Sequence, residues 1–394
     1  MKRRVAIIAA KRTPIGKFLG AFRNTTAVEL GTSVVRGVLD ASAIEAGDVD
    51  EVIFGNARQA GVKPNPARQI AFAADIPKEV PAYTVNMACA SGIKSITLGA
   101  DAITLGRASC VVAGGAENMT RVPFLLDRAR LGYRLGHAPL TDGMYQDGFG
   151  CPLSGMLMGE TAEVLADEFG IPREEQDGWA LISQHRAEAA RRDGVFAQEI
   201  LPVTAADDRG RPVEVTEDEH PRSGVTMEAL AKLPPVFRRD GSVTAGNASG
   251  ITDAAAAVVL TSEDRAKAWG KKPLGYIRDH TVVGVDPERM GIGPVPATKR
   301  ILERNDLRLE DIALIELNEA FAVQVLACQR ALGFDKEKVN VRGGAISLGH
   351  PIGATGTRIV VTLLHEMNRR GAELGLATLC VSGGLGMALL VERN

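Results

Sequence analysis

The sequence is poor in cysteine, and its few cysteines follow no pairing pattern. The 394 residues include 5 cysteines, an odd number that cannot all pair, and no Cys-x-x-Cys motif occurs. This pattern excludes a disulfide framework and a cysteine-based zinc site. It indicates a reducing compartment, in which a free thiol is available for chemistry.

An excess of charge of one sign and a long apolar run are also missing. With 46 basic and 48 acidic residues the net charge is −2, which argues against nucleic-acid binding driven by bulk charge. No segment reaches the roughly 18 apolar residues that a membrane span requires. The apolar run from Val5 to Ala10 is too short for the core of a signal peptide. We therefore expect a cytoplasmic protein that binds neither nucleic acid nor membrane.

Glycine, by contrast, is abundant, and the remaining composition is that of an ordinary enzyme. The 43 glycines are partly clustered, which indicates places where the backbone approaches a neighbour closely. Hydrophobic residues make up 45% and charged residues 24%, as in soluble globular proteins. The length predicts roughly two to three domains.

Strand patterns alternate with helix patterns in the first and last thirds of the chain, which predicts an α/β fold with a mixed or parallel sheet. The order of elements is the same in both thirds. Asn56 and Cys89 are 33 residues apart, and Asn318 and His350 are 32 apart, each pair joining a strand end to a helix start. We interpret this as an internal repeat, whose two halves can pack as stacked layers. Ligands in such sheets bind at the carboxyl ends of the strands.

The segment from about Thr120 to Gly250 differs from both halves. It is richer in charged residues and proline, and it contains one clear amphipathic helix pattern from Glu174 to Arg192. We interpret it as an insertion that lies over the strand ends and shapes access to them.

Cys89 is the first candidate for chemistry. It lies between a strand and a helix in Asn86-Met-Ala-Cys89-Ala-Ser-Gly92. The N–H groups and dipole of a helix N-terminus favour a thiolate there. The alternative is a buried structural cysteine, the usual role of a free thiol. Cys110 and Cys328 lie in apolar runs and are expected in the core, and Cys151 has no predicted role.

His350 is the second candidate, because it stands between glycine clusters just before a helix. A thiol nucleophile needs such a base, although a helix-capping histidine is the alternative. Cys380 ends a strand, and the glycine run after it can direct backbone N–H groups at an oxyanion or simply form a tight turn. Asn318, also at a strand end, can orient a water or a carbonyl, or it can cap the following helix.

Taken together, the motifs resemble those of the thiolases, the acetyl-CoA acetyltransferase group. The resemblance extends over essentially the whole chain and is carried by four motifs in the family's order, with Ala245-Gly-Asn-Ala-Ser249-Gly250 similar to its pantetheine-contacting turn. The four are Asn86 to Gly92, Asn318-Glu-Ala-Phe321, Gly349-His-Pro-Ile-Gly-Ala-Thr-Gly356 and Cys380 to Gly386.

The resemblance implies a role for each catalytic residue. Cys89 would carry the acyl group as a thioester, and His350 would activate it and help to hold the substrate's thioester oxygen. Cys380 would be the acid/base, and Asn318 would position a water that completes one oxyanion hole with His350. The backbone N–H groups of Cys89 and Ser382 would form a second oxyanion hole.

The resemblance also implies substrates, assembly and fold. Acyl-CoA and coenzyme A would bind as substrates, with no metal and no tightly bound cofactor, and the chain would form a homodimer or homotetramer. The residues expected to contact them are Met158, Arg222, Phe237, Ser249, Ala320 and Phe321. The implied fold is α/β and thiolase-like, with two similar mixed-sheet halves in a stacked α-β-α-β-α arrangement and an inserted loop domain. Residues 1–119, completed by 251–272, would form the first half, 120–250 the loop domain and 273–394 the second half.

Three positions depart from the family's pattern. Ser382 stands where the family usually has glycine, which reduces the backbone freedom of that turn. Leu157-Met-Gly159 replaces the His-Met-Gly of short-chain biosynthetic members, which argues against strict acetoacetyl specificity. Ala229 stands where some members have a serine near the nucleotide.

The sequence therefore predicts an acyltransferase that catalyses reversible condensation of acetyl-CoA or thiolysis of 3-ketoacyl-CoA. Two alternatives stay open. A decarboxylating or hydroxymethylglutaryl-type condensing enzyme is disfavoured by Cys380, and an inactive acyl-CoA-binding partner is disfavoured by the retained catalytic motifs.

Overall fold

The first half of the chain forms one side of a mixed sheet. A computed structural model describes residues 3–393 of the chain, so that residues 1, 2 and 394 of the predicted domain ranges lie outside it. The strands run in the order β4-β3-β5-β10-β1; β3 is parallel to β4 and β5, whereas β10 is antiparallel to β5 and β1. Their bounds are β1 Val5–Arg12, β3 Glu51–Gly55, β4 Ala82–Val85, β5 Cys110–Asn118 and β10 Thr252–Ser262, with a short β2 Gly16–Lys17 beside β10.

The second half repeats this arrangement. Its strands run in the order β12-β13-β14-β11, with β12 parallel to β13 and with β14 antiparallel to both of its neighbours. Their bounds are β11 Gly275–Gly284, β12 Leu314–Leu317, β13 Leu374–Val381 and β14 Leu385–Glu392. Strands β1, β3, β5 and β10 thus correspond to β11, β12, β13 and β14, which confirms the predicted repeat. The equivalent strands β1 and β11 pair antiparallel and join the halves into one ten-stranded sheet.

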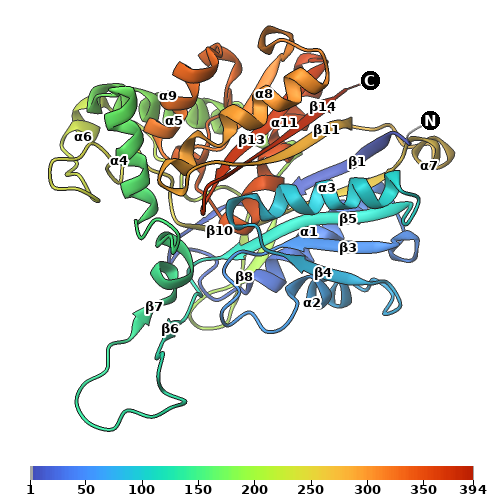
Figure 1. The fold of residues 1–394 in the computed structure, drawn as a ribbon. Coiled ribbons are helices and arrows are strands. Elements are labelled where there is room, and N and C mark those ends of the chain that lie inside the picture. Colours follow the sequence, from blue (N-terminus) through green and yellow to red (C-terminus); the bar gives the residue numbers. More distant parts are fainter. Residues whose placement is uncertain (1–2, 394) are drawn as a thin grey trace.

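Helices form three layers around the two sheet halves, giving the α-β-α-β-α order (Figure 1). Helices α3 and α11 pack against each other in the middle, where their side chains share one buried cluster with strands of both halves. The outer layers are built by α1 and α2 on the first half and by α8 and α9 on the second. The bounds are α1 Ala27–Ser42, α2 Pro66–Ala73, α3 Ser91–Thr104, α8 Pro294–Arg304, α9 Ala322–Leu332 and α11 Ile352–Arg370.

Most expected elements are present with small shifts of their ends, and the reasons are local. Helix α1 has the expected bounds, because Thr26 and Glu29 form a capping box at its start. Strand β10 had no clear signal in the sequence. Its residues Ala254 to Leu260 are all buried, since α1 and α11 pack on it, so no alternation appears. A run of alanines also favours a helix.

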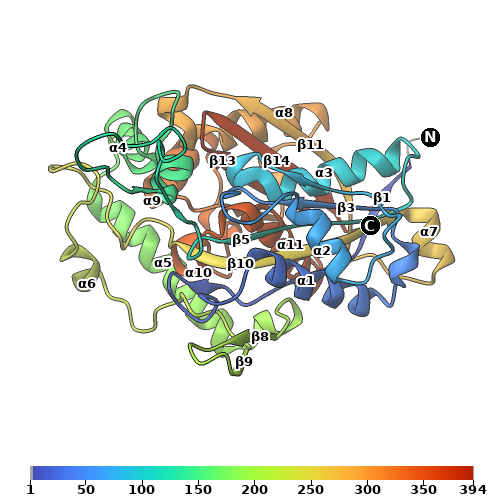
Figure 2. The same cartoon turned by 90° about the horizontal axis from the view of Figure 1, so that it is seen from below.

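Most of the inserted segment lies at the end of the molecule opposite the two termini, whereas residues 203–215 pack beside the first half (Figures 1 and 2). The predicted helix is present as α5, and α4, which the sequence analysis did not single out, packs beside it on α9. The bounds are α4 Met158–Phe169, α5 Arg173–Arg192 and α6 Met227–Ala231, with hairpins of β6 Phe124–Leu125 with β7 Thr141–Asp142 and of β8 Val203–Ala206 with β9 Pro212–Val215. The domain boundaries at 119, 250 and 272 stay a prediction.

Glycines make the central crossing of α3 and α11 unusually close. A Cβ atom added at Gly356 of α11 would lie 2.4 Å from the backbone nitrogen of Ile93 in α3. One added at Gly92 of α3 would lie 2.8 Å from the backbone nitrogen of Thr357. Backbone atoms cannot yield as a side chain can, so both helices depend on glycine here.

We expect the substitution Gly356→Ala to lower stability although it improves helix propensity. The added methyl group overlaps the backbone of α3, and such overpacking costs about 1–3 kcal/mol. The matched control is Gly178→Ala in α5, where no atom lies within 4 Å of the added Cβ. It should stabilise by about 0.4–1 kcal/mol. Thermal and urea unfolding of the two variants measures both effects, and an unchanged or raised stability of Gly356→Ala would contradict the close-contact argument.

Candidate active site

The inserted segment and both halves enclose one large cavity at the carboxyl ends of the central strands. Its volume is about 660 Å³. Of the eleven residues predicted for the site, ten line this cavity, and Asn318 lies directly behind its wall. The ten are Cys89, Met158, Arg222, Phe237, Ser249, Ala320, Phe321, His350, Cys380 and Ser382.

Cys89 lies in a tight turn between β4 and α3. The residue before it, Ala88, has a left-handed backbone with φ 45°, a conformation that costs a non-glycine residue energy and that recurs at functional sites. The Asn86 side chain accepts from the N–H of Ala88 at 3.0 Å, and the Ser91 hydroxyl accepts from that of Met87 at 2.9 Å. These bonds hold Cys89 half-buried in the cavity wall.

The Cys89 thiol is less acidic than the helix position suggests. Burial raises its pKa above the ordinary value, although hydrogen bonds from the backbone N–H groups of Ser382 and of Cys89 itself, and the charge of Arg58, lower it. The expectation of a favoured thiolate is therefore wrong for the free protein, because desolvation outweighs the helix terminus. The same two N–H groups are those predicted for the second oxyanion hole.

His350 lies at the start of α11 and is held by a chain of hydrogen bonds. Gly349 before it has φ 99°, and a Cβ there would lie 2.3 Å from the Thr252 side chain, so glycine is required. The Thr355 hydroxyl donates to the Pro351 carbonyl at 3.0 Å, so it accepts from Nδ1 of His350 at 2.6 Å. Neutral His350 therefore carries its proton on Nδ1 and keeps a lone pair on Nε2.

The protonation state of His350 is set by its surroundings. Burial, followed by the positive charges of Arg358 and Arg58, lowers the pKa of His350 to about 3. The ring is therefore neutral near pH 7 unless an anion lies beside it.

Asn318 lies at the end of β12, behind His350. Its Nδ2 is 3.5 Å from Nε2 of His350, and its buried Oδ1 has no partner within residues 3–393. It does not cap a helix, because α9 begins at Ala322 with Phe321 at the N-cap position. The structure thus favours the orienting role over the capping role.

Cys380 is the last residue but one of β13 and is almost fully buried beside Cys89. Burial raises the pKa of Cys380 well above its ordinary value, and the neighbouring Cys89 raises it further. The turn after it runs to β14 through Ser382, Gly383 and Gly384. Only the two glycines have positive φ, 87° and 83°, so serine fits position 382 without backbone strain.

The residues predicted to contact the substrate contribute a wall of the cavity, and two pairs of them are in direct contact. The N–H of Ser249 donates to the carbonyl of Ala320 at 3.0 Å, and Phe237 stacks edge-on against Phe321 with ring centroids 6.2 Å apart. Arg222 is fixed through its backbone N–H to the Gln184 side chain at 3.1 Å. The inserted segment is therefore joined to the second half at this wall.

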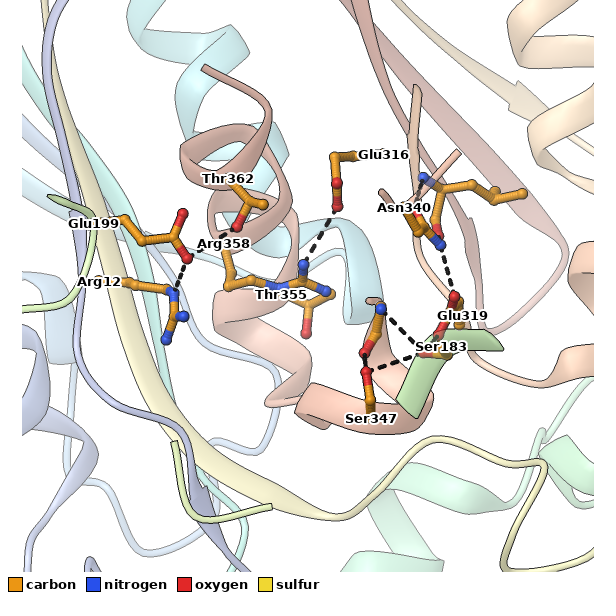
Figure 3. A network of polar contacts seen from close by, with 12 residues as sticks. Arg12, Ser183, Glu199, Glu316, Glu319, Asn340, Ser347, Thr355, Arg358 and Thr362 are labelled. Carbon is orange, nitrogen blue, oxygen red and sulfur yellow. Dashed lines mark hydrogen bonds and ion pairs between the residues drawn. The ribbon is translucent and has the colours of Figure 1, made fainter. Parts of the chain in front are cut away.

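Glu319 was part of a quoted motif, but its role was not predicted. It is fully buried and accepts hydrogen bonds from Ser183 at 2.7 Å and from Asn340 at 2.9 Å (Figure 3). It also accepts from the indole N–H of Trp179 at 3.1 Å. Ser183 and Trp179 belong to α5, so this carboxylate fixes the inserted segment beside Asn318. The only sign of this role in the sequence was the position of a glutamate between a strand end and a helix.

Two further kinds of feature were sought among residues 3–393. No group of three His, Cys, Asp or Glu side chains that could hold a metal ion occurs among residues 3–393. No helix in this part of the chain is long and apolar enough to cross a membrane. Cys110 and Cys328 are fully buried, as expected.

Comparison with known proteins places this geometry in a family. The sequence model of the thiolase N-terminal domain matches residues 5–264, and that of the thiolase C-terminal domain matches residues 271–393. Acetyl-CoA acetyltransferase of Pseudomonas aeruginosa is 52% identical over 390 residues, which is 99% of both chains. That of Escherichia coli is 50% identical over 388 residues, 98% of both chains.

Solved structures agree over the full length. Acetyl-CoA acetyltransferase of Bacillus anthracis has a TM-score of 0.98 at 47% identity, covering 100% of this chain and 99% of the other. Human mitochondrial 3-ketoacyl-CoA thiolase in complex with CoA has a TM-score of 0.95 at 41% identity, covering 100% and 98%. The motifs, the repeated fold and these matches agree, and the chain belongs to the thiolase family.

Proposed function

We propose that the protein is an acyltransferase that condenses two molecules of acetyl-CoA, or cleaves 3-ketoacyl-CoA with free coenzyme A. The observation that carries the proposal is the meeting of Cys89, His350 and Cys380 at one cavity. A thioester carbonyl requires a strong nucleophile, and carbon–carbon chemistry at the α-carbon requires a separate acid/base, so two thiols and an imidazole suffice.

Acyl transfer to Cys89 is the first step. Nε2 of His350 takes the thiol proton, the sulfur attacks the thioester carbonyl, and the carbon–sulfur bond to coenzyme A breaks. The leaving thiolate takes the proton of Cys380 and departs as free coenzyme A, which leaves Cys380 as a thiolate for the second step. Because the low pKa of His350 opposes a lasting imidazolium, the proton stays on Nε2 only while an anion lies nearby. The resulting N–H then donates to the developing oxyanion.

Carbon–carbon bond formation is the second step, and Cys380 serves it as base. Its thiolate removes a proton from the α-carbon of a second acetyl-CoA, and the carbanion attacks the acyl carbonyl on Cys89. The new carbon–carbon bond forms while the bond to Cys89 breaks. The high pKa of Cys380 suits it to this acid/base exchange, since a strongly basic thiolate can take a weakly acidic proton. Thiolysis is the reverse sequence.

Two oxyanion holes are proposed for these steps. One uses Nε2–H of His350 with a water held by Asn318, whose unpartnered Oδ1 supports this role. The other uses the backbone N–H groups of Cys89 and Ser382, which already lie at the Cys89 sulfur. Such preorganised donors commonly contribute about 10²–10³ in rate each.

Coenzyme A and acyl-CoA are proposed to bind as substrates along the wall of the inserted segment, with no tightly bound cofactor. The contacts are Met158, Arg222, Phe237, Ser249, Ala320 and Phe321, all of which line the cavity. We also propose a cytoplasmic homodimer or homotetramer, as the family resemblance implies. The condensing-enzyme alternative is disfavoured because Cys380 lies beside Cys89, where an acid/base thiol is useful.

Incubation with acetyl-CoA tests the first step. We expect one acetyl adduct on Cys89 in intact-mass and peptide measurements, and none in Cys89→Ala, because the thioester forms only on the nucleophile. If the wild-type protein takes no acetyl group and releases no coenzyme A, the proposed enzymatic function is excluded and only a binding function is left.

The substitution Cys380→Ser tests the division of labour. We expect acetylation of Cys89 to persist while condensation and thiolysis fall by at least about 100-fold, because the hydroxyl is a far poorer base. Mass measurements of the Cys89 adduct in quenched samples follow the first step, and a steady-state thiolysis assay follows the complete reaction. Equal loss of both would show that acylation depends on Cys380 as strongly as condensation does, against the proposed division of labour.

The pH dependence of thiol alkylation tests the electrostatics of the free site. His350, with a pKa of about 3, stays neutral from about pH 5 to 9, and the raised pKa of Cys89 keeps its thiol protonated. The rate of Cys89 alkylation by iodoacetamide should therefore rise about tenfold per pH unit up to pH 9, with no inflection near 6.5. Cys89→Ala corrects for the other thiols. A plateau below pH 7.5 would indicate a thiolate–imidazolium pair instead.

A further inference from the structure

Arg58 is a buried cation that lines the cavity, and the roles proposed above do not use it. Its side chain lies in the loop after β3 and is 6% exposed. Burial raises the pKa of Cys89 and lowers that of His350, and the positive charge of Arg58 lowers both. The guanidinium is therefore close to both residues, at the catalytic end of the cavity.

The guanidinium of Arg58 has few partners in the protein. Nη1 donates to the backbone carbonyl of Asp147 at 2.9 Å, and the buried Nε has no partner among residues 3–393. Within that part of the chain no carboxylate forms an ion pair with Arg58. The nearby Glu117 accepts instead from the backbone N–H groups of Ala57, Arg58 and Gly353. The charge of Arg58 is opposed by that of Glu117, whose pKa it lowers, but the buried Nε keeps an N–H group that an acceptor bound in the cavity would satisfy.

A π-helical turn, η3 (Tyr145–Phe149), lines the cavity beside Arg58. Tyr145 and Phe149 pack edge-on with ring centroids 5.5 Å apart, and both line the cavity. The guanidinium packs on the backbone of Gly148, where an added Cβ would lie 2.6 Å from Cζ of Arg58. None of the predicted coenzyme A contacts lies in η3, which leaves this part of the cavity lining available to the acyl part of the substrate.

We propose that Arg58 binds a carboxylate at the far end of the acyl chain, so that the substrates include 3-ketoacyl-CoA thioesters of dicarboxylic acids. This inference rests on the proposed function. The thioester oxygens are assigned to His350 and to the N–H groups of Cys89 and Ser382, which leaves Arg58 for another anion. Nε with the second terminal nitrogen presents two parallel N–H donors, the geometry that matches a carboxylate.

A pair of substrates of equal carbon number tests the proposal. Thiolysis of 3-oxoadipyl-CoA, which ends in a carboxylate, is compared with thiolysis of 3-oxohexanoyl-CoA, which ends in a methyl group. In Arg58→Leu we expect kcat/KM for 3-oxoadipyl-CoA to fall by at least about tenfold, the loss of one charged hydrogen bond. The value for 3-oxohexanoyl-CoA should fall much less, because it loses only the effect of the Arg58 charge on the pKa of Cys89.

Further variants separate recognition from folding. Gly148→Ala keeps the charge but displaces the guanidinium, and it should reproduce the selective loss. Arg107→Leu removes an exposed arginine of the same half and should change neither substrate. Thermal unfolding confirms that each variant is folded.

Three results would overturn the inference. Equal loss on both substrates, with the alkylation profile of Cys89 moved to higher pH, would make Arg58 an activator of the thiol only. If the wild-type protein cleaves 3-oxohexanoyl-CoA but not 3-oxoadipyl-CoA, thioesters of dicarboxylic acids are excluded as substrates. Thiolysis of neither, with no acetyl adduct on Cys89, would show that the proposed function itself fails, and the inference with it.

Discussion

The close crossing of α3 and α11 is the contact on which the rest of the structure depends. Each helix begins just after a residue of the site, α3 after Cys89 and α11 after His350. Because Gly92 and Gly356 allow backbone to meet backbone at the crossing, the two helix N-termini approach from opposite halves. Bulkier residues would hold the helices apart, and the two side chains would then not meet at one cavity.

The internal repeat explains how a near-symmetric fold builds an asymmetric site. Cys89 and His350 occupy equivalent positions, each after a left-handed residue, Ala88 or Gly349, and each before a central helix. One half thus supplies the nucleophile, and the other supplies the base together with Cys380. The repeat brings the equivalent positions of the two halves together at one cavity. The different side chains at those positions provide the chemistry.

Buried charges fix the inserted segment over this meeting point. Arg12 of β1 is fully buried and pairs with Glu199 at 2.7 Å and with Asp218 at 2.6 Å, while Glu319 holds α5 (Figure 3). Removing one partner of such a pair leaves an uncompensated buried charge, which costs about 3–5 kcal/mol. The segment is therefore held in one position, and the walls it contributes to the cavity are correspondingly fixed.

The alternation of strands and helices, the repeat and the residue types of the site can be predicted from the sequence, because periodicity and short motifs are local properties. The sequence could not show strand β10, since a strand buried on both faces has no alternation. The properties that depend on distant neighbours are set by the folded chain. Burial makes the Cys89 thiol less acidic than its helix position suggests, and chain packing brings Arg58 to the cavity. Desolvation and proximity arise from residues far apart in the chain, and no local pattern contains them.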